Sequence, residues 1–214
     1  MVQLSIHRLG EAALCCTLPA PVSLALQQGI WQLASALAAV QGVQELIPGM
    51  NNLTLTFDPL RTEAEALSKA AQALWAKPLR RRRPGRLVDI PVVYDGPDLA
   101  HVAAHCRLSE CEVVRRHARA AYVVYFIGFQ PGFAYLGGLD PSLHTPRRDD
   151  PRVAVPAGSV GIGGAQTGVY PLATPGGWQL IGRTRATLFD PQAEPPTLLA
   201  PGDRVRFVAE SSVA

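Results

Sequence analysis

The chain has 214 residues, enough for one large domain or two small ones and for a buried core that needs no disulfide framework. Hydrophobic residues make up 48% and charged residues 17% of the sequence, a composition that excludes a disordered chain. The formal net charge is +3, which is too small to indicate a nucleic-acid surface by itself.

Glycine and proline are unevenly distributed. Of the 19 Gly and 19 Pro, 13 Gly and 11 Pro lie between Gly128 and Ala214. Turns concentrated in one part of a chain indicate two domains of different type. We expect a first domain over residues 1–84 and a second over residues 85–214.

The sequence indicates a cytoplasmic protein without a membrane partner. No N-terminal stretch combines a basic start, an apolar core and a cleavage site, and no run reaches the ~18 apolar residues needed to span a bilayer. The cysteines form no C-x-x-C pair, which agrees with reduced thiols. They are Cys15, Cys16, Cys106 and Cys111.

The first elements follow from periodicity. Apolar residues tend to alternate from Leu4 to Leu18, the period of a half-buried strand, with a turn at Gly10. Ser23 is placed to cap a helix whose apolar positions share one face. These positions are Leu26, Ile30, Leu33, Leu37 and Val40. Renewed alternation predicts a hairpin from about Val43 to Asp58.

A second helix and another strand follow. Thr62 and Glu65 have the spacing of a capping box, and Pro78 ends the helix. Leu87 to Tyr94 is predicted to be a strand. The order strand, helix, strand, strand, helix, strand is that of a ferredoxin-like unit of α+β type, a fold that says nothing by itself about chemistry.

A basic stretch from Lys77 to Arg86 separates this helix from the next strand. It favours a solvated connector, and the alternative is a contact to phosphate or an acidic partner.

Two short helices are predicted between Asp98 and Ala118, with Asp98 capping the first and Ser109 the second. A metal-like cluster lies here, and two of its histidines are four residues apart. Nothing supplies the usual second ligand pair, so we expect helix-surface side chains and no metal site. The cluster is His101, His105, Cys106 and Cys111.

From Ala121 onward, short apolar strands separated by glycine and proline predict a small antiparallel barrel or sandwich. Several glycines adjoin aromatic residues, as in Phe129-Gln130-Pro131-Gly132-Phe133 and Gly176-Gly177-Trp178. This pattern suits close approach of the backbone to a ligand, and it equally suits tight turns plugged by core aromatics.

The stretch Gly158–Gly164, GSVGIGG, lacks the spacing of a P-loop, and no lysine exists in this half. A non-standard nest of backbone N–H groups at Gly158 and Ser159 stays open.

Six motifs follow one another in the second half of the chain, and with them the chain resembles the family of the 5-oxoprolinase B subunit, also named allophanate hydrolase subunit 1, which includes the kinase inhibitor KipI. The motifs are YFIGF (125–129), PGFAYL (131–136), VPAGSVGI (155–162), QTGVYP (166–171), PGGW (175–178) and GRT (182–184).

This resemblance implies an N-terminal ferredoxin-like domain followed by a C-terminal cyclophilin-like antiparallel β-barrel. It also implies an enzyme component that is active only with two partners, a barrel protein like the C subunit of 5-oxoprolinase and a protein like its A subunit. The complex would convert 5-oxoproline, ATP and water into glutamate, ADP and phosphate. The same two halves are fused in urea carboxylase.

Site residues are expected within the matching stretches. A five-membered lactam is a resonance-stabilised amide, so its hydrolysis needs an activated carbonyl, and phosphate transfer from ATP would supply one. Such a site needs cations and N–H donors. We expect Arg183, with Gly158 and Ser159, at the ATP phosphates, Gln166 and Tyr170 at the substrate, and His117 in proton transfer or orientation. A packing role for His117 is the alternative.

Two other functions stay open: a KipI-like inhibitor of a sensor histidine kinase with no catalysis of its own, and an enzyme component acting on another amide or urea derivative. Gln130 and the order Gly163-Gly164-Ala165 depart from the usual family pattern, and these departures bear on the identity of the substrate.

Overall fold

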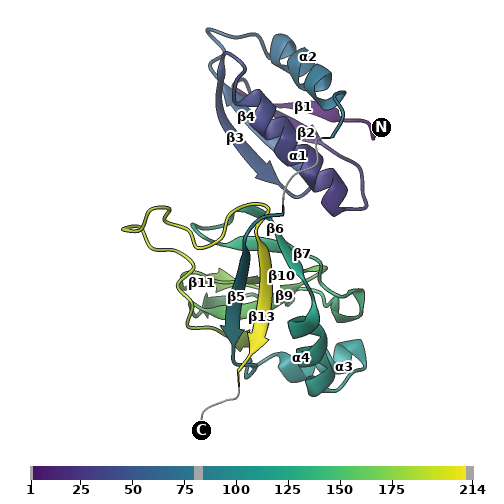
Figure 1. The fold of residues 1–214 in the computed structure, drawn as a ribbon, viewed down its shortest axis with the longest axis vertical. Helices are drawn as coiled ribbons and strands as arrows, with labels where there is room; N and C mark the ends of the chain where they lie inside the picture. The colour runs from purple at the N-terminus through teal and green to yellow at the C-terminus, as the bar shows by residue number, and fades with distance from the viewer. Residues whose placement is uncertain (1, 80–83, 211–214) are drawn as a thin grey trace. The chain divides into compact units, whose positions relative to one another are not determined.

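The computed structural model describes residues 2–79 and 84–210. Its internal contacts divide the chain into two compact units, Met1–Arg83 and Pro84–Ala214 (Figure 1). The centre of the predicted basic connector, residues 80–83, lies outside the described residues.

The first unit is a four-stranded antiparallel sheet covered by two helices. The strand order is β1-β2-β4-β3. Helix α1 packs against β3 and β4, and α2 packs against α1 and β2. The core between the layers is formed by alternate residues of β2 and β4 and by the apolar faces of the helices. The elements are β1 (Ser5–Leu9), β2 (Ala13–Thr17), α1 (Leu24–Leu37), β3 (Val43–Gly49), β4 (Asn52–Phe57) and α2 (Ala64–Trp75).

The predicted hairpin and both predicted helices of this unit are confirmed. The stretch from Leu4 to Leu18, predicted as a strand with a turn at Gly10, forms the two paired strands β1 and β2. One predicted cap is wrong. The Ser23 hydroxyl accepts a hydrogen bond from the N–H of Leu26, as a helix cap should. Helix α2 instead begins after Glu63 without any side-chain cap. The Thr62 side chain lies against Gly42, whose φ of 92° is a left-handed conformation. Thr62 is therefore occupied in packing, so the capping box does not form.

The expectation that Leu87 to Tyr94 completes the sheet of the first unit is wrong. Strand β5 (Leu87–Val92) belongs to the second unit, where it pairs in parallel with β13 (Arg204–Ala209). Ile90 and Val92 are completely buried in the core of that unit. The strand itself was recognisable from its pattern, but a local pattern does not specify which sheet a strand joins.

The second unit is a nearly closed barrel, consistent with the cyclophilin-like fold. Its sheet has the order β12-β9-β10-β7-β6-β13-β5. Beyond the end of β5, Val93 and Arg183 exchange two backbone hydrogen bonds of 2.9 Å and so connect the two border strands. Every strand pair in this sheet is antiparallel except β13 with β5. The remaining strands are β6 (Tyr122–Ile127), β7 (Ala134–Gly137), β8 (Arg152–Val155), β9 (Ser159–Gly163), β10 (Gln166–Val169), β11 (Thr174–Gly176) and β12 (Gln179–Arg183).

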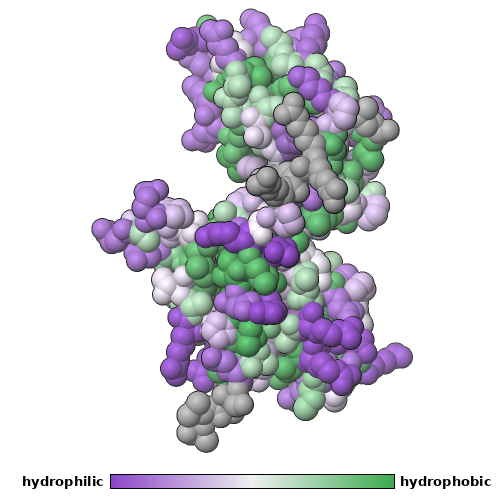
Figure 2. All heavy atoms as spheres, in the orientation of Figure 1, coloured by the Kyte–Doolittle hydropathy of each residue, from purple (hydrophilic) through white to green (hydrophobic). Residues whose placement is uncertain are grey.

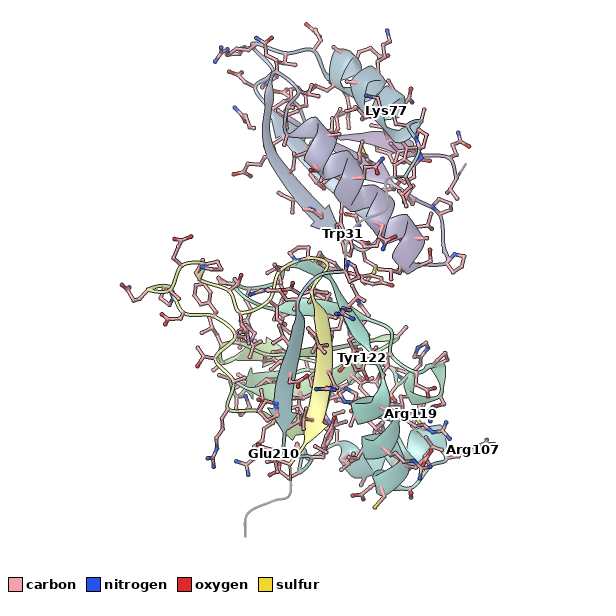
Figure 3. All side chains as sticks on the ribbon, viewed as in Figure 1. Trp31, Lys77, Arg107, Arg119, Tyr122 and Glu210 are labelled. Carbon is pink, nitrogen blue, oxygen red and sulfur yellow. The ribbon has the colours of Figure 1, made fainter. Side chains whose placement is uncertain are left out.

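Two helices, α3 (Leu99–Cys106) and α4 (Glu110–Arg119), pack against β12 and β13 respectively. Both were predicted. Tyr122, labelled in Figure 3, is completely buried in the barrel, and its ring meets that of Phe207 with centroids 5.2 Å apart. No helix in the described ranges is both long and apolar enough to cross a bilayer.

The outer face of β5 and β13 mixes hydrophobic and hydrophilic residues (Figure 2). Leu87 and Val208 are exposed there, and Asp89 forms an exposed ion pair with Arg206. This outer face is therefore partly apolar and partly charged.

Candidate functional site

An aromatic cluster covers the outer face of the barrel wall. Phe133, Tyr170 and Trp178 are buried, and Tyr135 packs against them. The ring centroids of Phe133 lie 5.2 Å from Tyr170 and 5.4 Å from Trp178, in edge-to-face geometry. Such pairs prefer this arrangement because the ring edge is positive and the face negative.

Glycines make room for these rings. In β9, Val160 and Ile162 point into the barrel core, so Gly161 and Gly163 face outward beneath Trp178. Gly168 of β10 pairs with Gly161, and a Cβ at Gly168 would meet the rings of Trp178 and Phe133 at 3.3 and 3.4 Å. The stretch GSVGIGG is therefore a strand whose outward positions are small enough for an indole to lie on it.

A small hollow opens within this cluster. It has a volume of about 90 Å³. Its walls are five aromatic rings, residues 175–177 at the end of β11 and the Arg147 side chain. The rings are those of Phe129, Phe133, Tyr135, Tyr170 and Trp178. The central carbon of the Arg147 guanidinium lies 5.9 Å from the centroid of the Trp178 ring, within cation–π range.

A wider groove of about 480 Å³ adjoins the hollow and shares Arg147 with it. Its lining includes His101 and His105 of α3 and the loop 146–150. Gln179, only 4% exposed, donates from Nε2 to the carbonyl of Pro146, while its Oε1 has no hydrogen-bond partner. The histidines predicted on a helix surface thus line a groove.

Asp98 anchors the loop that carries Arg147. This carboxylate is 4% exposed. Oδ1 accepts from Arg152 at 2.7 Å and from Arg148 at 3.3 Å, and Oδ2 accepts from the N–H of Leu180 at 2.6 Å. The predicted capping bond to α3 is absent. Asp98 fails as a cap because two arginines and a strand N–H already occupy its oxygens.

His117, a predicted catalytic residue, is completely buried in the barrel. Thr167 donates its hydroxyl hydrogen to Gly161, so its oxygen accepts from His117 Nε2 at 2.9 Å. His117 Nδ1 then accepts from the Tyr94 hydroxyl at 2.8 Å. Burial lowers the pKa of His117 from 6.5 to about 3. The imidazole is neutral and both nitrogens are occupied, an arrangement that suits a packing role.

The structure does not bring the predicted residues Gln166, Tyr170 and Arg183 together into one site. Gln166 begins β10, opposite Gly163, and its Nε2 is buried without a partner. Tyr170 lines the hollow, where burial raises the pKa of its hydroxyl. Arg183 stands at the end of the β9–β12 pair that is opposite to Gln166. Its side chain is 66% exposed and forms an ion pair with Asp95.

The three residues expected at ATP phosphates are neighbours. Arg183 pairs with Ser159, and the N–H of Thr184 donates to the carbonyl of Gly158. The N–H of Gly158 donates to Tyr170, and that of Ser159 to Pro156. Both donors are already used, so this end of the barrel fits a single charge contact from Arg183 rather than a phosphate-binding loop.

The motifs pointed to the hollow, but two of its features were missed. The first is Phe129, which has a left-handed φ of 69° and is 60% exposed. The second is Arg147, which the sequence does not distinguish from the other arginines of this half. Among the described residues, Arg147 is left without an ion pair because Asp98 binds its neighbours Arg148 and Arg152 instead. The sequence feature that could have marked this loop is the proline at each of its ends, Pro146 and Pro151. In the described parts of the chain, no three His, Cys, Asp or Glu side chains could together hold a metal ion.

The chain matches the carboxyltransferase domain family, subdomain C and D, over residues 4–199. It is 54% identical over 208 residues to the B subunit of 5-oxoprolinase from Escherichia coli O157:H7, covering 95% of each chain. It is 46% identical over 210 residues to the protein of that name from Haemophilus influenzae, covering 97% of this chain and 98% of the relative.

A solved structure, the urea amidolyase of Kluyveromyces lactis, has a TM-score of 0.84 and 20% identity over 98% of this chain. The chain spans 15% of that protein's length. At this identity the likeness concerns the fold alone.

Replacing Asp98 by Asn should destabilise the barrel unit by about 3 kcal/mol, because Arg148 and Arg152 lose a buried counter-ion. Urea unfolding followed by circular dichroism measures this change. The control is Asp89→Asn, which breaks the exposed pair with Arg206 and should change stability little. Equal effects of the two substitutions would contradict the anchoring role of Asp98.

The neutral His117 should make the barrel sensitive to acid. Its folded pKa of about 3 lies below its value of 6.5 in the unfolded chain, so its contribution is fully present above pH 6.5 and is lost as the pH falls toward 3. The loss amounts to about 4 to 5 kcal/mol. Urea midpoints between pH 7 and pH 4 should fall less steeply in His117→Gln than in the wild type, whereas the exposed control His7→Gln should keep the wild-type slope.

Proposed function

Because the chain belongs to the carboxyltransferase C and D family and is similar to the 5-oxoprolinase B subunit over nearly its whole length, we propose that it is one component of an ATP-dependent 5-oxoprolinase. The complex converts 5-oxo-L-proline to L-glutamate with release of ADP and phosphate. Its partners are a barrel protein like the C subunit of 5-oxoprolinase and a protein like the A subunit. The high identity to named B subunits over 95% of both chains carries this proposal.

The geometry supports a role as one wall of a shared site. The hollow and groove offer aromatic surface, the guanidinium of Arg147 and polar groups such as Gln179. These groups bind and orient a small polar molecule, and they leave the activation of its amide to the assembled complex. Arg183 adds an exposed positive charge at the other end of β12.

The test is reconstitution. The chain is purified with the two proposed partner proteins, and ADP release is measured with and without 5-oxo-L-proline. We expect release that depends on the lactam and is lost when any one of the three proteins is omitted. A complete complex with no lactam-dependent turnover would overturn the proposal. Inhibition of a sensor histidine kinase by the chain alone would then support the inhibitor function.

Arg183→Ala should lower turnover of the complex at least tenfold, because a charge-assisted contact of ~1.5–3 kcal/mol is removed. Size-exclusion chromatography should show that the complex still forms. Arg206→Ala is the matched control, since Arg206 is also an exposed barrel arginine paired with an aspartate. Equal rates in the wild type and Arg183→Ala would remove Arg183 from the site.

A further inference from the structure

We propose that the aromatic hollow beside Arg147 is a binding site for a small cyclic carboxylic acid, with the ring among the aromatic side chains and the carboxylate on the Arg147 guanidinium. The inference rests on the proposed function in one respect, that 5-oxo-L-proline is the natural ligand of this class. It assigns the binding of this acid to the present chain itself, independently of its partners.

The size and walls of the hollow fit one small ring. A volume of about 90 Å³ is several times the ~10–15 Å³ that a cavity needs to admit one water, so the hollow has room for a single small ring and not for a large ligand. Phe133, Tyr170 and Trp178 meet edge to face, so they present fixed apolar surfaces. Gly176, the last residue of β11, and Gly177 supply a wall without side chains.

Arg147 supplies the charge at the mouth of this hollow. Arg148 and Arg152 are both engaged by Asp98. In the part of the chain that the structure describes, Arg147 takes part in no ion pair, and its guanidinium lies over Trp178. A planar guanidinium recognises a carboxylate through two parallel hydrogen bonds. Arg147 is therefore the cation available to an anion at the hollow.

The field of Arg147 reaches into the hollow. Burial raises the pKa of Tyr135 and Tyr170, and the positive charge of Arg147 opposes this rise at both hydroxyls. The two tyrosines belong to different segments of the hollow's wall, and Arg147 is exposed, so its charge lies near both hydroxyls at the mouth of the hollow.

The contacts of Asp98 hold the loop of Arg147 in place before any ligand binds. Its carboxylate binds Arg148 and Arg152, which follow Arg147 in the chain, and also the N–H of Leu180 in β12. Arg147 thus projects from a loop that is anchored to the barrel wall. A group held in place before binding loses less conformational entropy when the ligand arrives.

Phe129 marks the rim as a functional position. A bulky residue in the left-handed region costs ~1–3 kcal/mol and persists only where its surroundings hold it there. Here the Gln130 side chain donates to the carbonyl of Leu172, and the N–H of Gly128 donates to that of Phe133. The exposed Phe129 ring meets those of Phe133 and Tyr170 edge to face, so the strained backbone places a ring at the mouth of the hollow.

The test compares two ligands on the purified full chain by ligand-observed NMR titration: 5-oxo-L-proline and 2-pyrrolidinone, the same lactam without the carboxylate. The wild type should bind 5-oxo-L-proline roughly 10- to 100-fold more tightly, the contribution of one charge-assisted contact. In Arg147→Ala this preference should vanish, while the affinity for 2-pyrrolidinone stays the same. The control Arg119→Ala removes an exposed arginine at the end of α4 (Figure 3) and should behave as the wild type.

A second variant tests the ring contact. Trp178→Leu should weaken both ligands together and leave their ratio unchanged, and thermal unfolding confirms that each variant folds. The proposal is overturned if the chain binds neither lactam, if it binds both equally, or if Arg147→Ala keeps the preference. These results are distinguishable from a failure of the proposed function, because carboxylate-selective binding without turnover in the complete complex would refute the enzyme and retain the site.

Discussion

Burial on both faces constrains the wall of the barrel more than any single contact. All five residues of β9 are buried, the inward ones by the barrel core and the outward ones by the aromatic cluster. The aromatic rings can lie this close to β9 because Gly161 and Gly163 have no side chains, and Gly168 makes the same room on the neighbouring β10. The hollow consequently rests on a wall that also holds the barrel together, and it inherits the rigidity of that wall.

Local periodicity was enough to predict the hairpin over Val43 to Asp58, both helices of the first unit and the pair α3 and α4. It could not assign β5 to its sheet, because its neighbour β13 lies more than a hundred residues away, as the Asp89–Arg206 pair with a separation of 117 shows. The prediction for Asp98 failed for the same reason. The N–H of Leu180 on β12, which donates to the Asp98 carboxylate, is 82 residues away in the chain. No sequence feature near Asp98 indicates this contact.

The candidate site was likewise predictable from the sequence only in part. Motif resemblance led to Tyr170, which lies in one of the ordered stretches rich in glycine and aromatic residues, but Trp178 was noted only as part of a motif and not as a site residue. It could not rank the arginines, since the availability of a guanidinium depends on which acid reaches it in three dimensions. Nor could it separate a reactive histidine from a packed one: the bonds of His117 to Tyr94 and Thr167 join three distant segments.

The parallel pairing of β13 with β5 has a consequence for biosynthesis. The strand that fills the gap between β6 and β5 is the last strand of the described chain. During translation, β5 and β6 emerge before β13, the strand that pairs with both, so each presents an unsatisfied edge until residues 204–209 leave the ribosome. Closure of the barrel is therefore a late, long-range event. Until then the two unpaired strand edges make the nascent unit prone to association.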